Sequence, residues 1–525
     1  MGFSPQNPHL LYMAAQYLMA STDSGRDWHH ASPDLTAIQR TERTDTASAA
    51  VRFRRYSPSI QSMSLSTRAA GEIWAGTSNG LVQMTRDAGQ HWSNVTPAAL
   101  PQRALVDAID ASHTTPGVAY FSVRAAGDWH PYIYRTTDFG KTWTDISNGL
   151  PQDQYVLSVR QDPDQANLLL VATKSTVYMS LDGGGHWQPL TLNLPTVEVT
   201  DIRFQAEQHA VVISTFGRAY WVLDDVQFLE QLAAAKVDNA SPYLFKPQQT
   251  WLLKRRVGGF GSSTRTGNSG ENLPAGAKVF FNLPADYAGQ PVKLSFTDAN
   301  GKAINSYTLP LQPKKTKAAF AKPAKVVPLH AGMNQFLWNM RYPDAVEVKG
   351  IMNTPFSASE PVGPEVLPGT YNVVLEYAGK TETQTFEVKL DPRLDTTQAG
   401  LQQRFDTLMQ VHDAMGRLNT SLNAAIDART ALQGASGGKA KQAVTTLNRD
   451  IDQFVNLQIQ SGEGGLVYPP RLRSWLSYIS NALGEQFVAP TPAMIKVKDM
   501  FVGGANAAVK TLDADVANAK AATGK

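Results

Sequence analysis

Four aspartates recur in one short pattern, Ser/Thr-x-Asp-x-Gly-x-x-Trp, whose copies read STDSGRDW, TRDAGQHW, TTDFGKTW and SLDGGGHW. Sets of carboxylates carry general acid and base catalysis, and glycoside hydrolysis uses two of them roughly 5 to 10 Å apart. One hypothesis is therefore that Asp23, Asp87, Asp138 and Asp182 do such chemistry.

The same residue types also fit a tight turn. The aspartate can accept hydrogen bonds from turn amides, the glycine can adopt a positive φ, and the tryptophan can bury its ring against a neighbouring sheet. Every fixed position is then explained without catalysis, so the sequence favours a structural role. These positions are Asp23, Gly25, Trp28, Asp87, Gly89, Trp92, Asp138, Gly140, Trp143, Asp182, Gly184 and Trp187.

The spacing of the four turns predicts a repeat architecture. Their aspartates are 64, 51 and 44 residues apart, near the roughly 40 to 50 residues of a four-stranded propeller blade. Apolar segments such as LLLVATKSTVYMS precede the turns, which predicts that each turn closes a β-hairpin. A fifth unit, residues 199–225, keeps the strands without the tryptophan-bearing turn. We expect about five blades over residues 1–228.

The repeat resembles the Asp-box (BNR) β-propellers of sialidases, xyloglucanase-type glycoside hydrolases and the N-terminal region of sortilin. The phrases ASPDLT, PYIYRTTDFGKTW and TFGRAYWVLDD are most similar to the bacterial "glycosyl hydrolase, BNR repeat-containing" group. The resemblance implies that the box aspartates lie at the blade periphery, away from the substrate, and that the protein is periplasmic or secreted. This chain has Phe216 where the family usually has a histidine, so any role of that imidazole is absent.

The first visible blade begins in mid-hairpin, with MGFSPQNPHLLYMAA supplying a turn and a strand. A propeller leaves exposed sheet edges until its ring closes. We therefore expect either missing N-terminal blades or a homo-oligomer to complete this one. The N-terminus also lacks the basic-then-apolar layout of a signal peptide.

One loop, RAAGDWHPYIY, gathers residue types suited to a binding site. Arg124, Trp129 and Tyr132 are candidate binding residues, because they offer a cation and aromatic surfaces for a sugar or a peptide. Asp128 and His130 are candidate catalytic residues, because a carboxylate and an imidazole can exchange protons. The alternative is a contact between blades, with Trp129 buried and Asp128 solvated.

Arg218, in the phrase TFGRAYWVLDD, is a further candidate binding residue that would line the central channel. The alternative is an ion pair with Asp224 or Asp225 that locks the last blade.

Several classes of function lack their signals. Four histidines lie beside the box tryptophans, but no two have the spacing of a metal site, so we predict no metal. There is no phosphate-binding loop, and we predict no cofactor. A net charge of +3 gives no reason to expect nucleic acid, and no run of about 18 apolar residues predicts a membrane span. The chain has no cysteine, which excludes disulfides.

Beyond the blades, the pattern predicts a linker over 229–275 that begins with a short helix, FLEQLAAA, then an immunoglobulin-like β-sandwich over 276–392 and a helical bundle over 393–525. Alternating segments such as VKLSFTD and TQTFEVKL are typical of strands, and the apolar stripe that runs from Leu401 to Ile426 is typical of a helix. We therefore predict a mainly β protein that binds glycan or polypeptide on its propeller face. The alternative is a glycoside hydrolase that acts through paired carboxylates.

Overall fold

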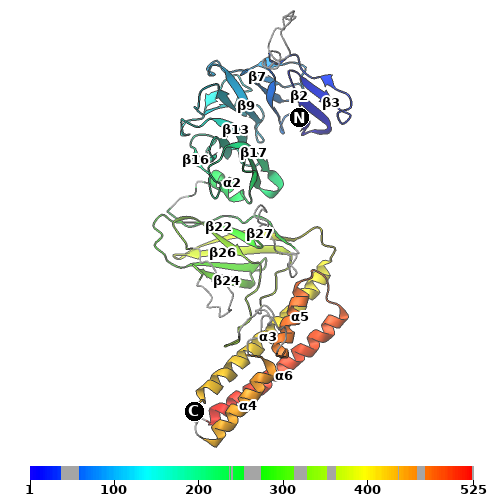
Figure 1. Ribbon diagram of the computed structural model, residues 1–525, viewed down its shortest axis with the longest axis vertical. Helices are drawn as coiled ribbons and strands as arrows, with labels where there is room; N and C mark the ends of the chain where they lie inside the picture. Colours follow the sequence, from blue (N-terminus) through cyan, green and yellow to red (C-terminus); the bar gives the residue numbers. More distant parts are fainter. Residues whose placement is uncertain are drawn as a thin grey trace, which may run out of the picture. The chain divides into compact units, whose positions relative to one another are not determined.

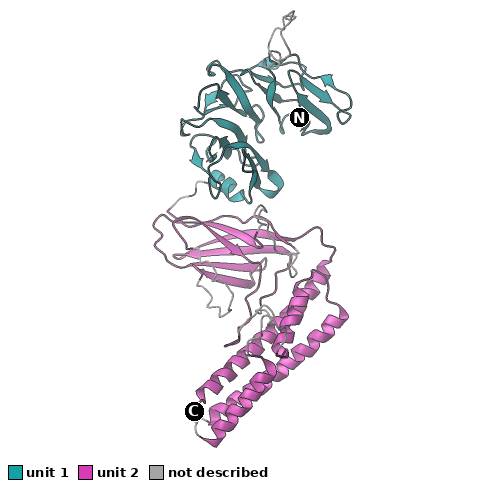
Figure 2. Cartoon of the chain, in the orientation of Figure 1, with its two compact units in different colours: residues 1–237 teal, residues 238–525 magenta. Residues whose placement is uncertain are grey.

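The computed structural model describes residues 1–36, 58–235, 237, 240–253, 274–311, 328–351, 362–434, 437–457 and 468–522. Its contacts divide the chain into two compact units, residues 1–237 and residues 238–525 (Figure 2). None of the helices in these described ranges is both long and apolar enough to cross a membrane.

Unit 1 is a series of β-propeller blades, which confirms the predicted fold class. Its described part holds five antiparallel sheets whose strands follow one another in chain order (Figure 1). The first four sheets have four strands and the fifth has three. They are β1 (Gly2–Ser4), β2 (Asn7–Ala14), β3 (Leu18–Ser21) and β4 (His29–His30); β5 (Ile60–Leu65), β6 (Ile73–Thr77), β7 (Val82–Thr85) and β8 (Ser93–Asn94); β9 (Ala104–Ala111), β10 (Ala119–Ala125), β11 (Tyr132–Thr136) and β12 (Thr144–Asp145); β13 (Val156–Gln161), β14 (Leu169–Thr173), β15 (Val177–Ser180) and β16 (Gln188–Pro189); β17 (Val199–Gln205), β18 (Ala210–Thr215) and β19 (Tyr220–Leu223).

The hydrophobic core of unit 1 lies between the blades. Each of its four clusters joins two successive sheets. Tyr120 and Phe121, neighbours on β10, contribute to different clusters, because successive side chains of a strand point to opposite faces. Both faces of the inner blades are thus buried, and this is why their strands read as continuous apolar runs.

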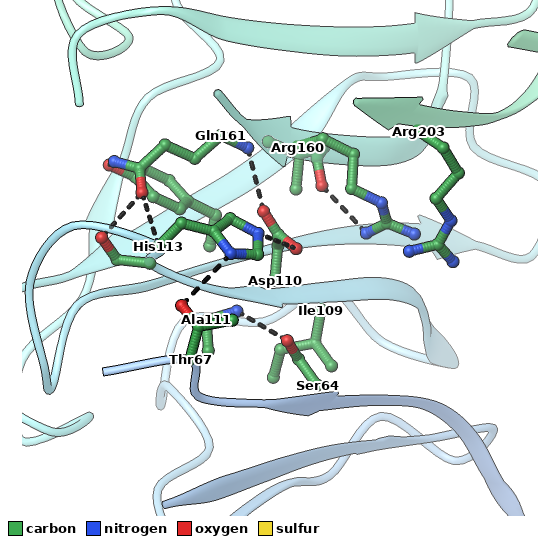
Figure 3. A network of polar contacts seen from close by, with 12 residues as sticks. Ser64, Thr67, Ile109, Asp110, Ala111, His113, Arg160, Gln161 and Arg203 are labelled. Carbon is green, nitrogen blue, oxygen red and sulfur yellow. Dashed lines mark hydrogen bonds and ion pairs between the residues drawn. The ribbon is translucent and has the colours of Figure 1, made fainter. Parts of the chain in front are cut away.

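Hydrogen bonds also join the first strands of successive blades (Figure 3). The amide of Ala111 on β9 donates to the Ser64 hydroxyl on β5 at 2.9 Å. The amide of Gln161 on β13 donates to the Asp110 carboxylate on β9, also at 2.9 Å. Asp110 is buried, and these bonds fix the register of one blade against the next.

The four repeated turns share one hydrogen-bond pattern, which the third copy illustrates. The Thr136 hydroxyl donates to Asp138 Oδ1 at 2.8 Å and accepts from the Gly140 amide at 2.9 Å. The Thr142 amide donates to Asp138 Oδ1 at 2.9 Å. The other three copies form equivalent bonds. Each aspartate therefore closes its own turn.

In the second, third and fourth copies, the tryptophan reaches the preceding blade. Its indole Nε1 donates to a backbone carbonyl just after the fourth strand of that blade. The bonds are Trp92 to Ala31 at 3.2 Å, Trp143 to Val95 at 2.7 Å and Trp187 to Ile146 at 2.7 Å. In the first copy Trp28 donates within its own turn, to the Gly25 carbonyl at 2.9 Å.

Unit 2 contains a β-sandwich followed by helices, as the sequence predicted. Trp338 of one sheet stacks on Phe296 of the other, with ring centroids 4.2 Å apart. One sheet is β20 (Tyr243–Leu244), β22 (Ala277–Leu283) and β25 (Gly332–Trp338); the other is β21 (Thr250–Leu252), β27 (Lys380–Leu390), β26 (Gly369–Tyr377), β23 (Val292–Asp298) and β24 (Ala303–Leu309).

In the described residues after the sandwich, four helices share one apolar core. They are α3 (Gln398–Ala431), α4 (Gly438–Phe454), α5 (Leu472–Gly484) and α6 (Pro492–Ala522). Leu401 of α3 and Phe487 after α5 also enter the sandwich core, so the sandwich and the helices are packed as parts of one unit.

The predicted linker begins with the short helix that FLEQLAAA indicated. Its first residues form α2 (Gln227–Ala234), and Leu229 on this helix is buried in the cluster between the fourth and fifth blades. Strand β20 is part of one sheet of the sandwich, and strand β21 is part of the other. Most of the Gly/Ser-rich stretch, residues 254–273, lies outside the described residues.

The contact between a turn glycine and the preceding blade is testable with two alanine variants. Gly89 has φ +98°, and a Cβ there would lie 2.1 Å from the Ala31 carbonyl oxygen. Gly149 has φ +95°, with the nearest such atom 3.9 Å away. Both variants should lose about 1–2 kcal/mol of unfolding free energy through the left-handed backbone, and Gly89→Ala should lose clearly more. Chemical denaturation measures the unfolding free energy of both variants. Equal losses would contradict a tight contact between Gly89 and the preceding blade.

Candidate functional site

The strands of each blade alternate in direction, which sorts the loops onto two edges. Loops after the first and third strands emerge at one edge, and loops after the second and fourth strands emerge at the other. The repeated turns follow the third strand, whereas the loop that contains Trp129 follows the second. The four turn aspartates and the predicted binding loop therefore lie at opposite edges of their blades. We call the second edge the Trp129 edge.

Trp129 is held between side chains of the next blade. Tyr155, just before β13, lies against it with ring centroids 5.6 Å apart. Lys174, in the turn between β14 and β15, places its Nζ 3.5 Å from the centre of the indole. Trp129 nevertheless keeps 49% of its surface exposed. It is both a contact between blades and a fixed, accessible aromatic surface, which combines the two interpretations of the sequence.

Arg124 is paired with a buried carboxylate on its own sheet. Its Nε and Nη2 donate to the two oxygens of Asp107 at 2.6 and 2.7 Å. Burial raises the pKa of Asp107, and the guanidinium opposes that shift, while the contact with Asp107 raises the pKa of Arg124. The guanidinium also lies 5.6 Å from the centre of the Tyr155 ring. Its charge is thus compensated, and its planar face belongs to the aromatic cluster.

The cluster continues onto the fifth blade. The Tyr155 hydroxyl donates to Glu198 Oε2 at 2.9 Å, and Glu198 comes directly before β17. The amide of Phe216 donates to the Glu198 carbonyl at 2.9 Å. The Phe216 side chain is 76% exposed. Loops from three successive blades therefore form one aromatic and charged strip at the Trp129 edge.

Asp128 does not have the environment of a general acid. Its oxygens accept from the His130 amide at 2.9 Å and from the Tyr132 hydroxyl at 2.7 Å. The His130 amide, and then the Tyr132 hydroxyl, hold its pKa below the usual value. Burial, together with the nearby Asp128, raises the pKa of Tyr132 to about 12. The Asp128–Tyr132 pair orders the loop, with the His130 ring 4.7 Å from that of Tyr132.

Arg218 lies in the exposed turn between β18 and β19. Its carbonyl accepts from Trp221 Nε1 at 3.1 Å. Its guanidinium forms no ion pair with any residue in the described part of the chain, so the predicted pair with Asp224 or Asp225 is not seen there. Arg218 is an exposed cation on the same edge as Phe216.

At the opposite edge, three side chains form a compact polar group. Asp164, His209 and Glu230 place one candidate ligand atom each within 4.8 Å of the others. His209 Nδ1 lies 2.8 Å from Glu230 Oε1, within hydrogen-bond distance. The sequence did not point to this group, because its members come from two blades and from α2.

The residues that sequence reasoning missed are Tyr155, Lys174 and Glu198. Each lies in a loop at the start or middle of a later blade. Tyr155 and Lys174 contact Trp129, and Glu198 contacts Tyr155, only through packing between blades. The blade period could have found them, since it aligns the loop after each second strand with the loop that enters the next blade.

Comparisons with known proteins give similarity to solved structures alone. No family model matches the chain, and no curated protein matches it. The GH74 xyloglucanase from Xanthomonas campestris aligns with 43% of this chain and 36% of its own, at 19% identity and a TM-score of 0.34. An ancestral GH74 enzyme aligns with 58% of this chain and 37% of its own, at 14% identity and a TM-score of 0.31.

YCF48 bound to D1 peptide is also similar, over 41% of this chain and 76% of its own, at 17% identity and a TM-score of 0.23. The alignments thus span only about a third of the two GH74 proteins. At these identities the similarity concerns the fold alone.

The hydrogen bonds at Asp138 predict acid sensitivity. The Thr142 hydroxyl and amide lower the pKa of Asp138 to about 2, from 3.8. A depressed pKa in the folded state stabilises the fold above pH 3.8, and this contribution disappears as the pH falls towards 2. The variant Asp138→Asn should therefore have a lower Tm than the wild type near pH 6, and the gap should close between pH 4 and 2. Calorimetry across this range measures it; a gap that is constant with pH would exclude the carboxylate as its cause.

Proposed function

We propose that this chain is a sortilin-like, BNR-repeat β-propeller protein that binds a glycan at the Trp129 edge. The observation that carries the proposal is Trp129 itself, half exposed yet fixed by Tyr155 and Lys174 of the next blade. A flat aromatic ring suits the apolar face of a sugar ring, and a side chain that is already immobilised loses little entropy on binding.

Polar groups around the ring suit a ligand rich in hydroxyls. The Glu198 carboxylate has a second oxygen beyond the one that Tyr155 occupies, and the Arg124 guanidinium lies beside the Tyr155 ring. Charged groups of this kind give the stronger hydrogen bonds to neutral ligands. An extended polypeptide is the second ligand class, since it too combines apolar surface with hydrogen-bonding groups.

The carboxylates nearest Trp129 suit ligand binding better than they suit glycoside hydrolysis. A glycosidase needs a carboxyl of raised pKa that reaches the substrate, together with a second carboxylate. The pKa of Asp128 is lowered, and Glu198 accepts from Tyr155. Asp107 has a raised pKa, but its side chain is 7% exposed and is held by Arg124.

A glycoside hydrolase of the sialidase or xyloglucanase type is the alternative function. The observation that favours this alternative is the raised pKa of Asp107. Asp107 is hydrogen-bonded to Arg124, and Arg124 in turn lies beside the Tyr155 ring of the aromatic cluster. Release of reducing ends from a polysaccharide panel that includes xyloglucan would support this alternative, and its loss in Asp107→Asn would identify the acid.

The resemblance to BNR proteins also suggests a periplasmic or secreted protein that is not complete as five blades. Tyr220 and Val222 on β19 are 77% and 57% exposed. Large apolar residues on one face of a sheet fit a surface that is covered in the assembled protein. In this proposal, N-terminal blades or a second copy of the chain complete the propeller.

Two tryptophan variants test the binding proposal. Trp129→Ala should raise the dissociation constant for polysaccharide, measured by affinity electrophoresis, by about 10-fold or more, as expected for an aromatic anchor. Trp475→Ala is the matched control, because Trp475 is 41% exposed but lies on α5 in the other unit. It should leave retardation unchanged. If Trp129→Ala migrates like the wild type, Trp129 is not the anchor.

A further inference from the structure

Three side chains with metal-binding groups converge at the edge opposite to Trp129. Asp164 comes from the loop between β13 and β14, His209 from the loop between β17 and β18, and Glu230 from α2. One candidate ligand atom of each lies within 4.8 Å of the other two, and no second group of this kind occurs in the part of the chain that the structure describes. An imidazole among carboxylates is a donor set for transition metals, which a patch of surface acids is not.

Backbone contacts hold the three groups in place, although their segments are distant in sequence. The His209 carbonyl accepts from the Val226 amide at 2.7 Å, which joins the β17–β18 loop to the start of α2. Leu229 of α2 is buried in the cluster between the fourth and fifth blades. In the other loop, the Asp164 amide donates to Asp162 Oδ1 at 2.9 Å. Groups that are positioned before a ligand arrives lose little entropy on binding it.

The negative charge of this region is not balanced by lysine or arginine. Asp162, Asp164 and Glu230 form no ion pair with either residue type in the described ranges. Asp162 is 1% exposed and accepts from the amides of Asp164 and Gln165. Burial raises the pKa of Asp162 to about 6, and the charges of Glu230 and Asp164 add to the shift. Since buried charges in proteins are paired or coordinate metals, a cation bound beside Asp162 would offset this charge.

An ion can reach the three groups from solvent. Asp164 is exposed, and the side chains of His209 and Glu230 are 26% and 12% exposed. His209 Nδ1 and Glu230 Oε1 already lie 2.8 Å apart. Zinc binds nitrogen and oxygen ligands at about 2.0–2.2 Å, which places two ligands of one ion roughly 3–3.6 Å apart. A small rotation of the exposed Asp164 side chain therefore completes a set of three ligands, and water can supply a fourth.

We propose that Asp164, His209 and Glu230 bind a divalent transition-metal ion, and that zinc matches this set best. Imidazole together with carboxylates suits zinc, whereas magnesium and calcium prefer oxygen ligands alone. The ion joins the loops of the fourth and fifth blades to α2 and so fastens this helix to the last blade. The site is independent of the proposed glycan site, because it lies at the opposite edge of the blades.

Isothermal titration of zinc chloride into the untagged full chain, first treated with a chelator, tests the site. Asp164→Asn should weaken zinc binding by about 10-fold or more, at least the loss that follows removal of an outer-shell partner. Its side chain is exposed, so the variant should fold like the wild type. Glu230→Gln should weaken binding similarly, because it keeps the size of the side chain but removes its charge. Circular dichroism checks the folding of each variant.

His186→Gln is the matched control. His186 forms a pair with the Asp182 carboxylate, as His209 does with Glu230, but no third ligand joins that pair among the described residues. The control variant should keep the zinc affinity of the wild type. Saturating zinc should also raise the Tm of the wild type more than that of Asp164→Asn. A wild type that binds no zinc, or binds magnesium as tightly, would overturn the assignment, as would equal zinc affinity in the wild type, Asp164→Asn and Glu230→Gln.

Discussion

The described blades of the propeller unit depend on contacts with one another, because their apolar clusters lie between sheets. Each hydrophobic cluster joins two successive sheets, and a sheet with two apolar faces is stable only when both are covered. The repeated turn adds a directed contact to this packing. Its indole donates to a carbonyl of the preceding blade, and its glycine allows the close approach that a Cβ would block.

The candidate binding site depends on these contacts between successive blades. Trp129 meets Tyr155 and Lys174 across one blade boundary, and Tyr155 meets Glu198 across the next. A shift of one blade against another would separate these groups. None of them belongs to a repeated turn, although the repeated turns help to hold the blades in place. The fold thus places its repeated turns at one edge, where they hold the blades together, and leaves the other edge to loops that differ from blade to blade.

Much of this architecture could be predicted from the sequence. The spacing of Asp87, Asp138 and Asp182 indicated the blade period, and the stripe from Leu401 indicated α3. The blade period indicates which loops lie beside the Trp129 loop, but the contacts of Tyr155 and Lys174 with Trp129 could not be predicted, because they depend on the register between sheets. The short helix α2 was predicted from FLEQLAAA, but the burial of Leu229 against the last blades was not, because it depends on packing between distant segments.

Hydrogen exchange with and without a bound oligosaccharide would test most directly whether loops of several blades form one site. The account predicts that a ligand slows exchange together in residues 124–132, 174–176 and 197–199, which belong to three blades, and leaves the repeated turns unchanged. Slower exchange confined to one of these loops, or found at the turns around Asp87 and Asp138, would contradict it.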